Sequence, residues 1–395
     1  MTAVMPTERP PTPAVPASLP TPALRWEIQR GLTALDELAP AWDALARRNA
    51  LSPTADALWM RCFWRAFSGD DDQLHIHTLW RGDELMGVLP LRQTGRWLRA
   101  WSTVANGHTP FVLYATDTDF GVVAREILAH LLESADTIDL ERFLAQGPLC
   151  HALITEATER GLPVAQEARP GDAVLPLFGP WDEFHRSLPE NIERDTPRKR
   201  RKLERLGKLD FEVVRGGERL DERLQACFEL ETRGWKGRHG SPIIARPQTH
   251  RFYTGLAHAA AAAGRFALYL LRCDDKLIAF EFCLRGDRQL DMLKLSFDPA
   301  CSAYSPGNVL RYFVFQTEIE QGQVDTYRFG EVSEWKQRWT RHVEPLVRLR
   351  IYRRDAKGRL ACLAGPRLRN GLKEWRGLRQ AVLWARKLRA QRRGP

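Results

Sequence analysis

One order of secondary-structure elements occurs twice in this chain of 395 residues, and it limits the fold more than any other feature. The first half predicts a strand and helix at 26–49, a helix at 53–67, a hairpin at 74–93, a helix at 120–134, a strand at 137–143 and a helix at 150–161. The second half predicts a strand at 211–216, helices at 220–235 and 249–264, three strands within 266–299, a helix after Pro306, and a strand, short helix and strand within 326–354. The repeat indicates a duplicated α/β (α+β) fold with two mixed sheets flanked by helices.

The basic charge is concentrated in two places. The net charge is +10, and residues 366–395 contribute +9 of it, with ten Lys or Arg against Glu374. A second basic run, RDTPRKRRKLERLGK, spans 194–208. The chain outside residues 366–395 is therefore close to neutral, and a charge argument for nucleic acid or membrane applies only to these two segments.

Cysteine content and hydropathy exclude several classes of protein. The seven cysteines are odd in number, scattered, and without a C-x-x-C pair, so neither a disulfide framework nor a structural zinc site is expected. Apolar runs such as FALYLL (266–271) are far shorter than the roughly 20 residues that cross a bilayer. We expect a cytoplasmic protein that carries no metal.

The composition divides the chain into four parts. We expect a disordered Pro-rich tail at 1–23, a first domain at 24–178 and a second domain at 179–354. A basic amphipathic helix and tail are expected at 355–395. The last segment places Leu368, Leu372, Trp375, Leu378, Val382 and Leu388 at helical spacing, with arginines between them. Such a helix at 366–393 fits peripheral contact with an anionic membrane, and capping of a domain is the alternative.

The stretch DMLKLSFDPACSAYSPGNVLRYFVFQTEIEQG (291–322) alternates like a strand, turns at Pro306 and Gly307, and continues as a helix. A helix start presents N–H groups to anions, so those of Asn308, Val309 and Leu310 predict a phosphate seat. Ser305 is suited to be the N-cap or to add a hydroxyl donor. The alternative is that Ser-Pro-Gly only starts a helix after a strand.

Four segments carry a resemblance to a known family. They are GDELMGVLPLR (82–92), PRKRRKLERLGKLDFEVV (197–214), RGWKGRHGSPIIARPQTHRFYTGLA (233–257), and FDPACSAYSPGNVL with YRFGEVSEWKQRW (297–310 and 327–339). In their order and spacing they resemble the GNAT acyltransferase superfamily, and more narrowly tandem-GNAT acetyltransferases of the CelD/BcsL type. The segment 197–214 also resembles the Fem aminoacyl transferases, which use aminoacyl-tRNA. The departure from the GNAT pattern is that the turn keeps one glycine, Gly307, of a usually Gly-rich loop.

The resemblance implies a donor site in the second domain and a degenerate first domain that completes the acceptor cleft. Acetyl-CoA or another acyl-CoA is then the co-substrate, held at Ser305, Gly307, Asn308, Val309 and Leu310. Glu331 is the candidate general base and Tyr304 the candidate acid, with Tyr327 a second candidate acid. Glu331 paired with Arg328, Lys336 or Arg338, and tyrosines that only pack, are the alternatives.

The resemblance also implies an acceptor side and a reaction. The candidate acceptor-binding residues are Trp235, Lys236, Arg238, Trp335 and Lys336, although tryptophans at helical spacing also occur in cores. The implied activity is acyl transfer to an amine or hydroxyl of a small-molecule or glycan acceptor, in exopolysaccharide or cellulose formation. A Fem-like aminoacyl transferase and a non-catalytic scaffold for a polysaccharide synthase stay open as alternatives. We expect neither DNA nor tRNA to be a partner, since Leu203 and Leu206 give the basic run a packing stripe.

Overall fold

The computed structural model describes residues 23–49, 51–112, 114–234 and 242–364. The predicted Pro-rich tail up to residue 22 and the predicted basic helix at 366–393 lie outside these ranges.

The first half follows the expected element order. Its elements are β1 (Leu24–Arg30), α1 (Gly31–Arg48), α2 (Ala57–Phe67), β2 (His75–Arg81), β3 (Glu84–Thr94), β4 (Ala100–Thr103), β5 (Ala115–Thr116), α3 (Phe120–Ser134), β6 (Thr137–Leu144), α4 (Pro148–Glu159) and β7 (Val164–Pro176). The hairpin of β2 and β3 is confirmed, with its turn at Gly82 and Asp83. Strand β7 was not expected, because Pro170 and Gly171 interrupt its alternation; they fall at a register shift against β13, where a bulge tolerates proline.

The second half repeats the order. Its elements are α5 (Trp181–Ser187), α6 (Glu190–Glu204), β8 (Leu209–Val214), α7 (Leu220–Arg233), α9 (Pro247–Ala262), β9 (Phe266–Cys273), β10 (Lys276–Arg285), β11 (Gln289–Phe297), the 3-10 turn η4 (Pro299–Tyr304), α10 (Pro306–Gln321), β12 (Thr326–Glu331), α11 (Glu334–Gln337) and β13 (Val343–Tyr352). The α/β class is therefore confirmed, and α6 contains most of the basic run.

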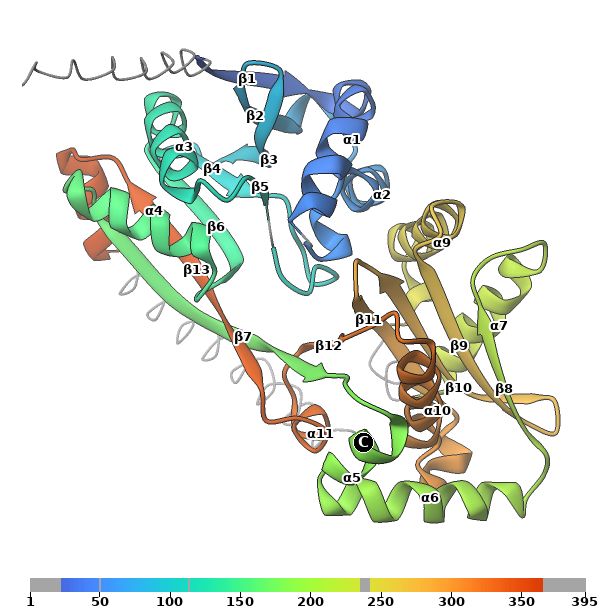
Figure 1. Cartoon of the computed structure of the whole chain (residues 1–395). Coiled ribbons are helices and arrows are strands. Elements are labelled where there is room, and N and C mark those ends of the chain that lie inside the picture. Colours follow the sequence, from blue (N-terminus) through green and yellow to red (C-terminus); the bar gives the residue numbers. More distant parts are fainter. Residues whose placement is uncertain (1–22, 50, 113, 235–241, 365–395) are drawn as a thin grey trace, which may run out of the picture.

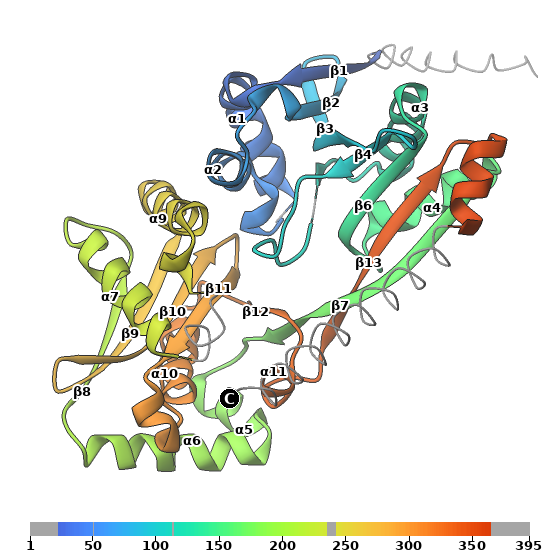
Figure 2. The ribbon, with the colours of Figure 1, turned by 180° about the vertical axis from the view of Figure 1, so that it is seen from behind.

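The two expected sheets are joined into one mixed sheet of 13 strands. The order is β1-β2-β3-β4-β6-β13-β7-β12-β11-β10-β9-β8, with β5 beside β3. The halves exchange their last strands: β13 lies between β6 and β7, and β7 extends across the molecule to pair with β12 (Figures 1 and 2). Neither half therefore forms its part of the sheet from its own strands alone.

Helices from both halves share one hydrophobic core. The side chains of α1 and α2 pack into the same buried cluster as those of α7 and α9. At their contact the rings of Trp59 and Phe252 meet edge to face with centroids 5.3 Å apart. Figures 1 and 2 show α2 facing α9 across the junction of the halves. This packing fixes the first half against the second beside the candidate site.

Candidate functional site

A pocket opens where two parallel strands separate. β11 and β12 pair only through Gln289↔Thr326, Leu290↔Tyr327 and Asp291↔Arg328, although both strands continue beyond these residues. A pocket of about 360 Å³ lies at this separation, between 292–295 of β11 and 329–331 of β12. Its other lining residues are Gly107, His108, Thr109, Pro110, Arg142, Tyr253, Ser333, Trp335 and Lys336. The pocket therefore takes side chains from both halves.

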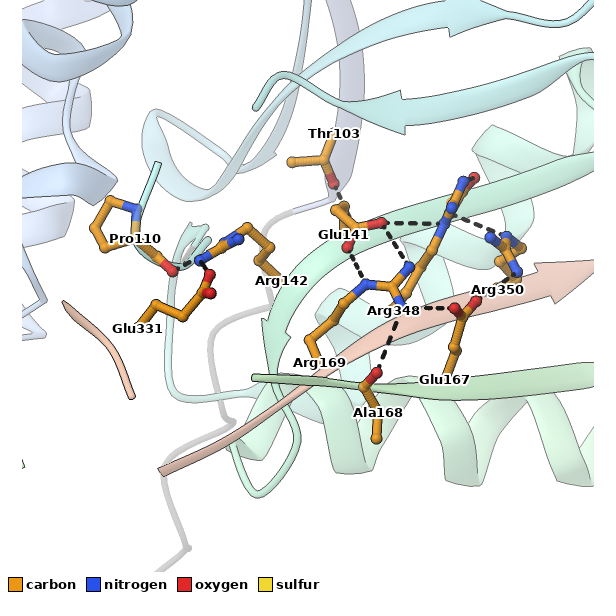
Figure 3. A network of polar contacts seen from close by, with 11 residues as sticks. Thr103, Pro110, Glu141, Arg142, Glu167, Ala168, Arg169, Glu331, Arg348 and Arg350 are labelled. Atoms are coloured by element: carbon orange, nitrogen blue, oxygen red, sulfur yellow. Dashed lines mark hydrogen bonds and ion pairs between the residues drawn. The ribbon is translucent and has the colours of Figure 1, made fainter. Parts of the chain in front are cut away.

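Arg142 connects the first half to the candidate base. Its Nε donates to the Pro110 carbonyl oxygen at 3.0 Å and its Nη2 donates to Glu331 Oε2 at 2.8 Å (Figure 3). The backbone of Arg142 has φ 56°, at a register shift between β6 and β13. A bulge of this kind redirects a side chain out of the regular alternation. The bulge thus carries the guanidinium across to the strand end of the second half.

Glu331 lies at the end of β12, where the sequence predicted it. Gly330, with φ 74°, precedes it at a second register shift, a backbone conformation that glycine adopts without strain. The Glu331 side chain is 49% exposed. Its carboxylate forms an ion pair with Arg142, a partner that the sequence did not suggest. Lys336 instead donates from Nζ to the Glu331 carbonyl oxygen at 2.7 Å.

Arg328 has other carboxylate partners, below the pocket. Its Nη1 lies 2.7 Å from Asp172 Oδ2 and 2.6 Å from Glu344 Oε2, and its guanidinium stacks over the ring of Phe111. Burial raises the pKa of Asp172 to about 6, while Arg328 opposes the shift. Burial also raises the pKa of Asp291, which accepts from Ser52 Oγ at 2.5 Å. The ion pairs of Arg328 thus connect β12 to β7 and β13.

The predicted phosphate seat differs in detail from the expectation. The N–H groups of Asn308 and Val309 both donate to the Ser305 carbonyl oxygen, at 2.9 and 3.2 Å, so the expectation that they are unpaired is wrong. Pro306 has no N–H, which leaves Gly307 as the first-turn amide that can turn to a ligand. Ser305 is at the N-cap position with φ 50°, and its side chain makes no capping hydrogen bond.

The remaining predicted donor-side residues lie near the turn or in the core. Val309 and Leu310 are fully buried, so their side chains cannot contact a ligand. Tyr304 ends η4 and packs against a hydrophobic cluster; it is not one of the pocket-lining residues. Tyr327 is fully buried and donates to Glu281 Oε2 at 2.7 Å, and burial raises its pKa well above the usual range. Tyr327 is therefore a core residue whose hydroxyl is bonded to Glu281.

Two of the candidate acceptor-binding residues, Trp335 and Lys336, line the pocket. The Trp335 ring lies 4.8 Å from the guanidinium of Arg311, which is 1% exposed and ion-paired with Glu281. Trp335 thus has one side in the core and one at the pocket. The other predicted acceptor-side residues, Trp235, Lys236 and Arg238, lie outside the described residues.

One pocket residue that was not predicted is Tyr253 of α9. Its hydroxyl lies 3.2 Å from His108 Nδ1. The His108 ring stacks on Phe67, with centroids 5.2 Å apart. Burial raises the pKa of Tyr253 well above the usual range, so the phenol keeps its proton. Tyr253 follows ordinary helical spacing in the sequence, which gives no signal of a site.

The corresponding gap in the first half is filled by its own chain. β4 and β6 are parallel and pair through 100–102 and 137–139, as β11 and β12 do. Beyond that point, Val112 bridges to Phe143 and its N–H donates to the Arg142 carbonyl oxygen at 2.9 Å. This leaves the second half with the open gap.

The described residues contain no group of three or more His, Cys, Asp or Glu side chains placed to hold a metal ion. None of the helices in the described ranges has the length and apolarity needed to cross a membrane.

Comparisons with known proteins agree with this geometry. Residues 191–337 match the family model of the acetyltransferase (GNAT) domain. The structure of FemX is 12% identical with a TM-score of 0.58, covering 82% of this chain and 98% of its own. A C-terminal DUF2156 domain from Agrobacterium fabrum, assigned to a lysylphosphatidylglycerol synthetase, is 14% identical with a TM-score of 0.53, covering 84% and 94%. A conserved protein of unknown function from Bacteroides thetaiotaomicron is 11% identical with a TM-score of 0.51, covering 82% and 97%.

The structural likenesses establish the fold alone, because their identities are low. The comparison with curated protein sequences finds no match. The family model covers the segment from α6 to α11, which includes β11, β12 and the open gap between them. Residues 191–337 are thus a GNAT acetyltransferase domain, and the protein is an acyltransferase.

Proposed function

We propose that the pocket between β11 and β12 holds the thioester of an acyl-CoA and transfers its acyl group to an amine or hydroxyl by direct attack. The observation that carries the proposal is the parallel pair that ends at Asp291 and Arg328 and opens into a pocket with Glu331 at its rim. Separated strands leave backbone N–H groups free to polarise a carbonyl inserted between them. A carboxylate beside that carbonyl can accept the proton that the attacking group loses.

In this mechanism Glu331 is the general base, oriented by Arg142. The attacking nitrogen or oxygen forms a bond to the acyl carbon, its proton passes to the Glu331 carboxylate, and the carbon–sulfur bond breaks. The leaving thiolate then takes up a proton. The ion pair holds one carboxylate oxygen toward the first half, so the other is available to the acceptor. We place the acceptor between Glu331 and the loop 107–110, because this loop forms the opposite wall.

The phosphates of the donor fit the turn before α10. Fewer backbone N–H groups are available to bind them there than the three that the sequence suggested. Gly307 supplies the available first-turn N–H, and a Cβ built there meets only Phe297 at 3.7 Å, so the backbone is open to approach. Lys199 of α6 lies beside this turn, where its Nζ donates to the Ala303 carbonyl oxygen at 2.6 Å. We assign the pyrophosphate to Gly307 and Lys199, with Ser305 as the nearest hydroxyl.

Acetyl-CoA is the first donor to test, and the acceptor class follows from the resemblance to CelD/BcsL-like proteins. A glycan or glycan precursor suits Trp335 and Lys336, which place an aromatic ring and an ammonium at the pocket. This assignment connects the protein to exopolysaccharide or cellulose formation.

A Fem-like aminoacyl transferase is the second candidate. α6 exposes Arg201 and Lys202, and Arg205 follows them, none with a carboxylate within ion-pair distance in the described part of the chain. Such cations suit the phosphates of a tRNA acceptor end.

Calorimetric titration of acetyl-CoA and free CoA tests the first candidate. Gly307→Glu places a carboxylate in the proposed phosphate seat and should abolish binding with the fold retained. Gly121→Glu is the matched control, since it adds the same charge to the first turn of α3, where nothing lies within 4 Å of the added Cβ. Binding that survives Gly307→Glu would refute the assigned seat. Wild-type protein that binds neither ligand would move aminoacyl-tRNA ahead of acyl-CoA.

A further inference from the structure

The turn between β3 and β4 exposes a tryptophan among arginines. The strands pair up to Thr94↔Ala100, and residues 95–99, here named the Trp97 tip, project beyond them. Trp97 is 90% exposed, the most exposed large apolar side chain of the described residues. Folding usually buries most of a tryptophan side chain. A fully exposed tryptophan is typical of a surface that contacts another apolar phase, such as a partner protein or a membrane.

The tip is built to hold Trp97 outward. Gly95 has φ 81°, and a Cβ at this position would lie 2.1 Å from the Leu98 carbonyl oxygen, so the turn requires glycine. At its base, Thr94 Oγ1 and Ser102 Oγ are 2.7 Å apart, and the Arg99 N–H donates to Asp136 Oδ2 at 2.8 Å. These contacts fix both ends of the turn, so the exposure of Trp97 follows from the fold.

Basic side chains predominate around the tip. Arg92, Arg96 and Arg99 are exposed, and none of them forms an ion pair with a carboxylate in the described ranges. A nearby acid is Asp136 at the base of the turn, whose pKa is lowered, against the opposing effect of burial, by Lys357 and in part by the charge of Arg99. Three exposed guanidinium groups next to an exposed indole match an anionic surface with an apolar interior.

The end of the described chain adjoins the same place. Lys357 Nζ bonds the same Asp136 oxygen as the Arg99 N–H, at 2.8 Å. Residues 356–364 are helical and expose Leu360 and Leu363, 68% and 71% accessible. The segment 366–395 with its ten Lys and Arg follows directly in sequence. Within the described chain, the exposed side chains of Leu360 and Leu363 therefore follow the lysine that adjoins the Trp97 tip.

We propose that the Trp97 tip is a membrane-contact site that inserts its indole into the headgroup region of a bilayer containing anionic phospholipid. Tryptophan prefers this region, where the ring is in an apolar layer and its N–H meets polar groups. Arg92, Arg96 and Arg99 bind the lipid phosphates, and each basic residue near such a surface adds to the affinity. The site is distinct from the acyltransferase pocket and does not depend on the donor identity.

Vesicle flotation of the full chain tests the proposal. The probes are vesicles of phosphatidylcholine with 30% phosphatidylglycerol, and of phosphatidylcholine alone, at low salt. We expect binding to the anionic vesicles only. Trp97→Ala should reduce it clearly, and the double variant Arg96→Gln and Arg99→Gln should lower the partition coefficient about 30-fold.

Two matched controls separate the tip from general effects. Leu206→Ala removes another exposed apolar side chain, and Arg201→Gln with Lys202→Gln removes two exposed cations of α6; both should float like the wild type. Lipids brominated near the headgroup should quench wild-type fluorescence more than that of Trp97→Ala. Tip variants that float like the wild type would assign binding to the C-terminal segment and overturn the proposal. So would wild-type protein that floats with neither vesicle, or an RNA that protects the tip arginines while vesicles do not.

Discussion

The side chain of His77 in β2 gives the most quantitative prediction, because burial strongly disfavours its protonated form in the folded state. The ring is fully buried, and neither ring nitrogen has a hydrogen-bond partner among the described residues. It packs edge to face on Trp101, with centroids 4.5 Å apart, and lies 5.7 Å from the ring of Trp26. Burial lowers the pKa of His77 from 6.5 to about 3, and His75 and His130 add smaller contributions of the same sign.

The sign and magnitude follow from the two pKa values. Between pH 6.5 and pH 3 the unfolded chain binds a proton at His77 that the folded chain does not bind. Stability from this site is therefore fully present above pH 6.5 and is lost as the pH falls toward 3. Between pH 7.5 and pH 5.0 the loss is about 2 kcal/mol of unfolding free energy.

The assay is urea unfolding of wild type and His77→Phe at pH 7.5 and pH 5.0, followed by tryptophan fluorescence. Phenylalanine keeps a ring between Trp26 and Trp101 and cannot titrate, so the variant should gain about 2 kcal/mol relative to wild type on going to pH 5.0. Asp172, whose pKa burial raises, titrates in both proteins and cancels in the comparison. His151→Phe, which replaces an exposed histidine, is the control. A difference between wild type and His77→Phe that does not change with pH would refute the reasoning.

Three further predictions concern the pocket and its support. Glu331→Gln should lower CoA release with a panel of amine and hydroxyl acceptors by roughly 10²–10⁴-fold while acetyl-CoA binding, by calorimetry, stays unchanged; full activity would remove Glu331 as the base. Arg142→Met should lower the same rate with a smaller loss, about ten-fold, because Glu331 loses its orientation but keeps its chemistry; a loss equal to that of Glu331→Gln would assign Arg142 to the substrate instead. Arg311→Met should destabilise the fold by about 3–5 kcal/mol because it leaves the buried Glu281 carboxylate without its cation, with the hydrogen bond from Tyr327 still present. Adding Glu281→Gln should recover most of that loss in urea unfolding; no recovery would mean that Arg311 acts through packing on Trp335.

Much of the second half could be predicted from sequence because its signals are local. The strands of 266–299 alternate, the helix after Pro306 starts with turn residues, and Glu331 follows a strand that ends in glycine. These patterns act over a few residues, so the order of β11, α10 and β12 and the place of Glu331 at the strand end followed from them. The same locality explains why Trp335 and Lys336 were found.

The partner of Glu331 could not be predicted in the same way. Arg142 is 189 residues away in the chain and reaches Glu331 only because a bulge turns its backbone to φ 56° without a glycine to mark it. The pairing of the Asn308 and Val309 amides is different, because the carbonyl of an N-cap residue accepts the first hydrogen bonds of its helix, so this pairing follows once the helix start is placed. The reach of Arg142 arises from tertiary packing, which overrides the local preference of the residue.

The insertion of β13 between β6 and β7 has a consequence for synthesis on the ribosome. A nascent chain that ends before residue 343 has made β6 and β7 but lacks the strand that joins them. Both strands then have an open edge, which is prone to intermolecular pairing. Pairing over such a large sequence separation is also slow, because the chain loses the entropy of loop closure before the stabilising contacts between the strands form. Closure of the first-half sheet and assembly of the pocket therefore coincide late in folding, so a chain shortened at 342 should aggregate rather than retain a working half.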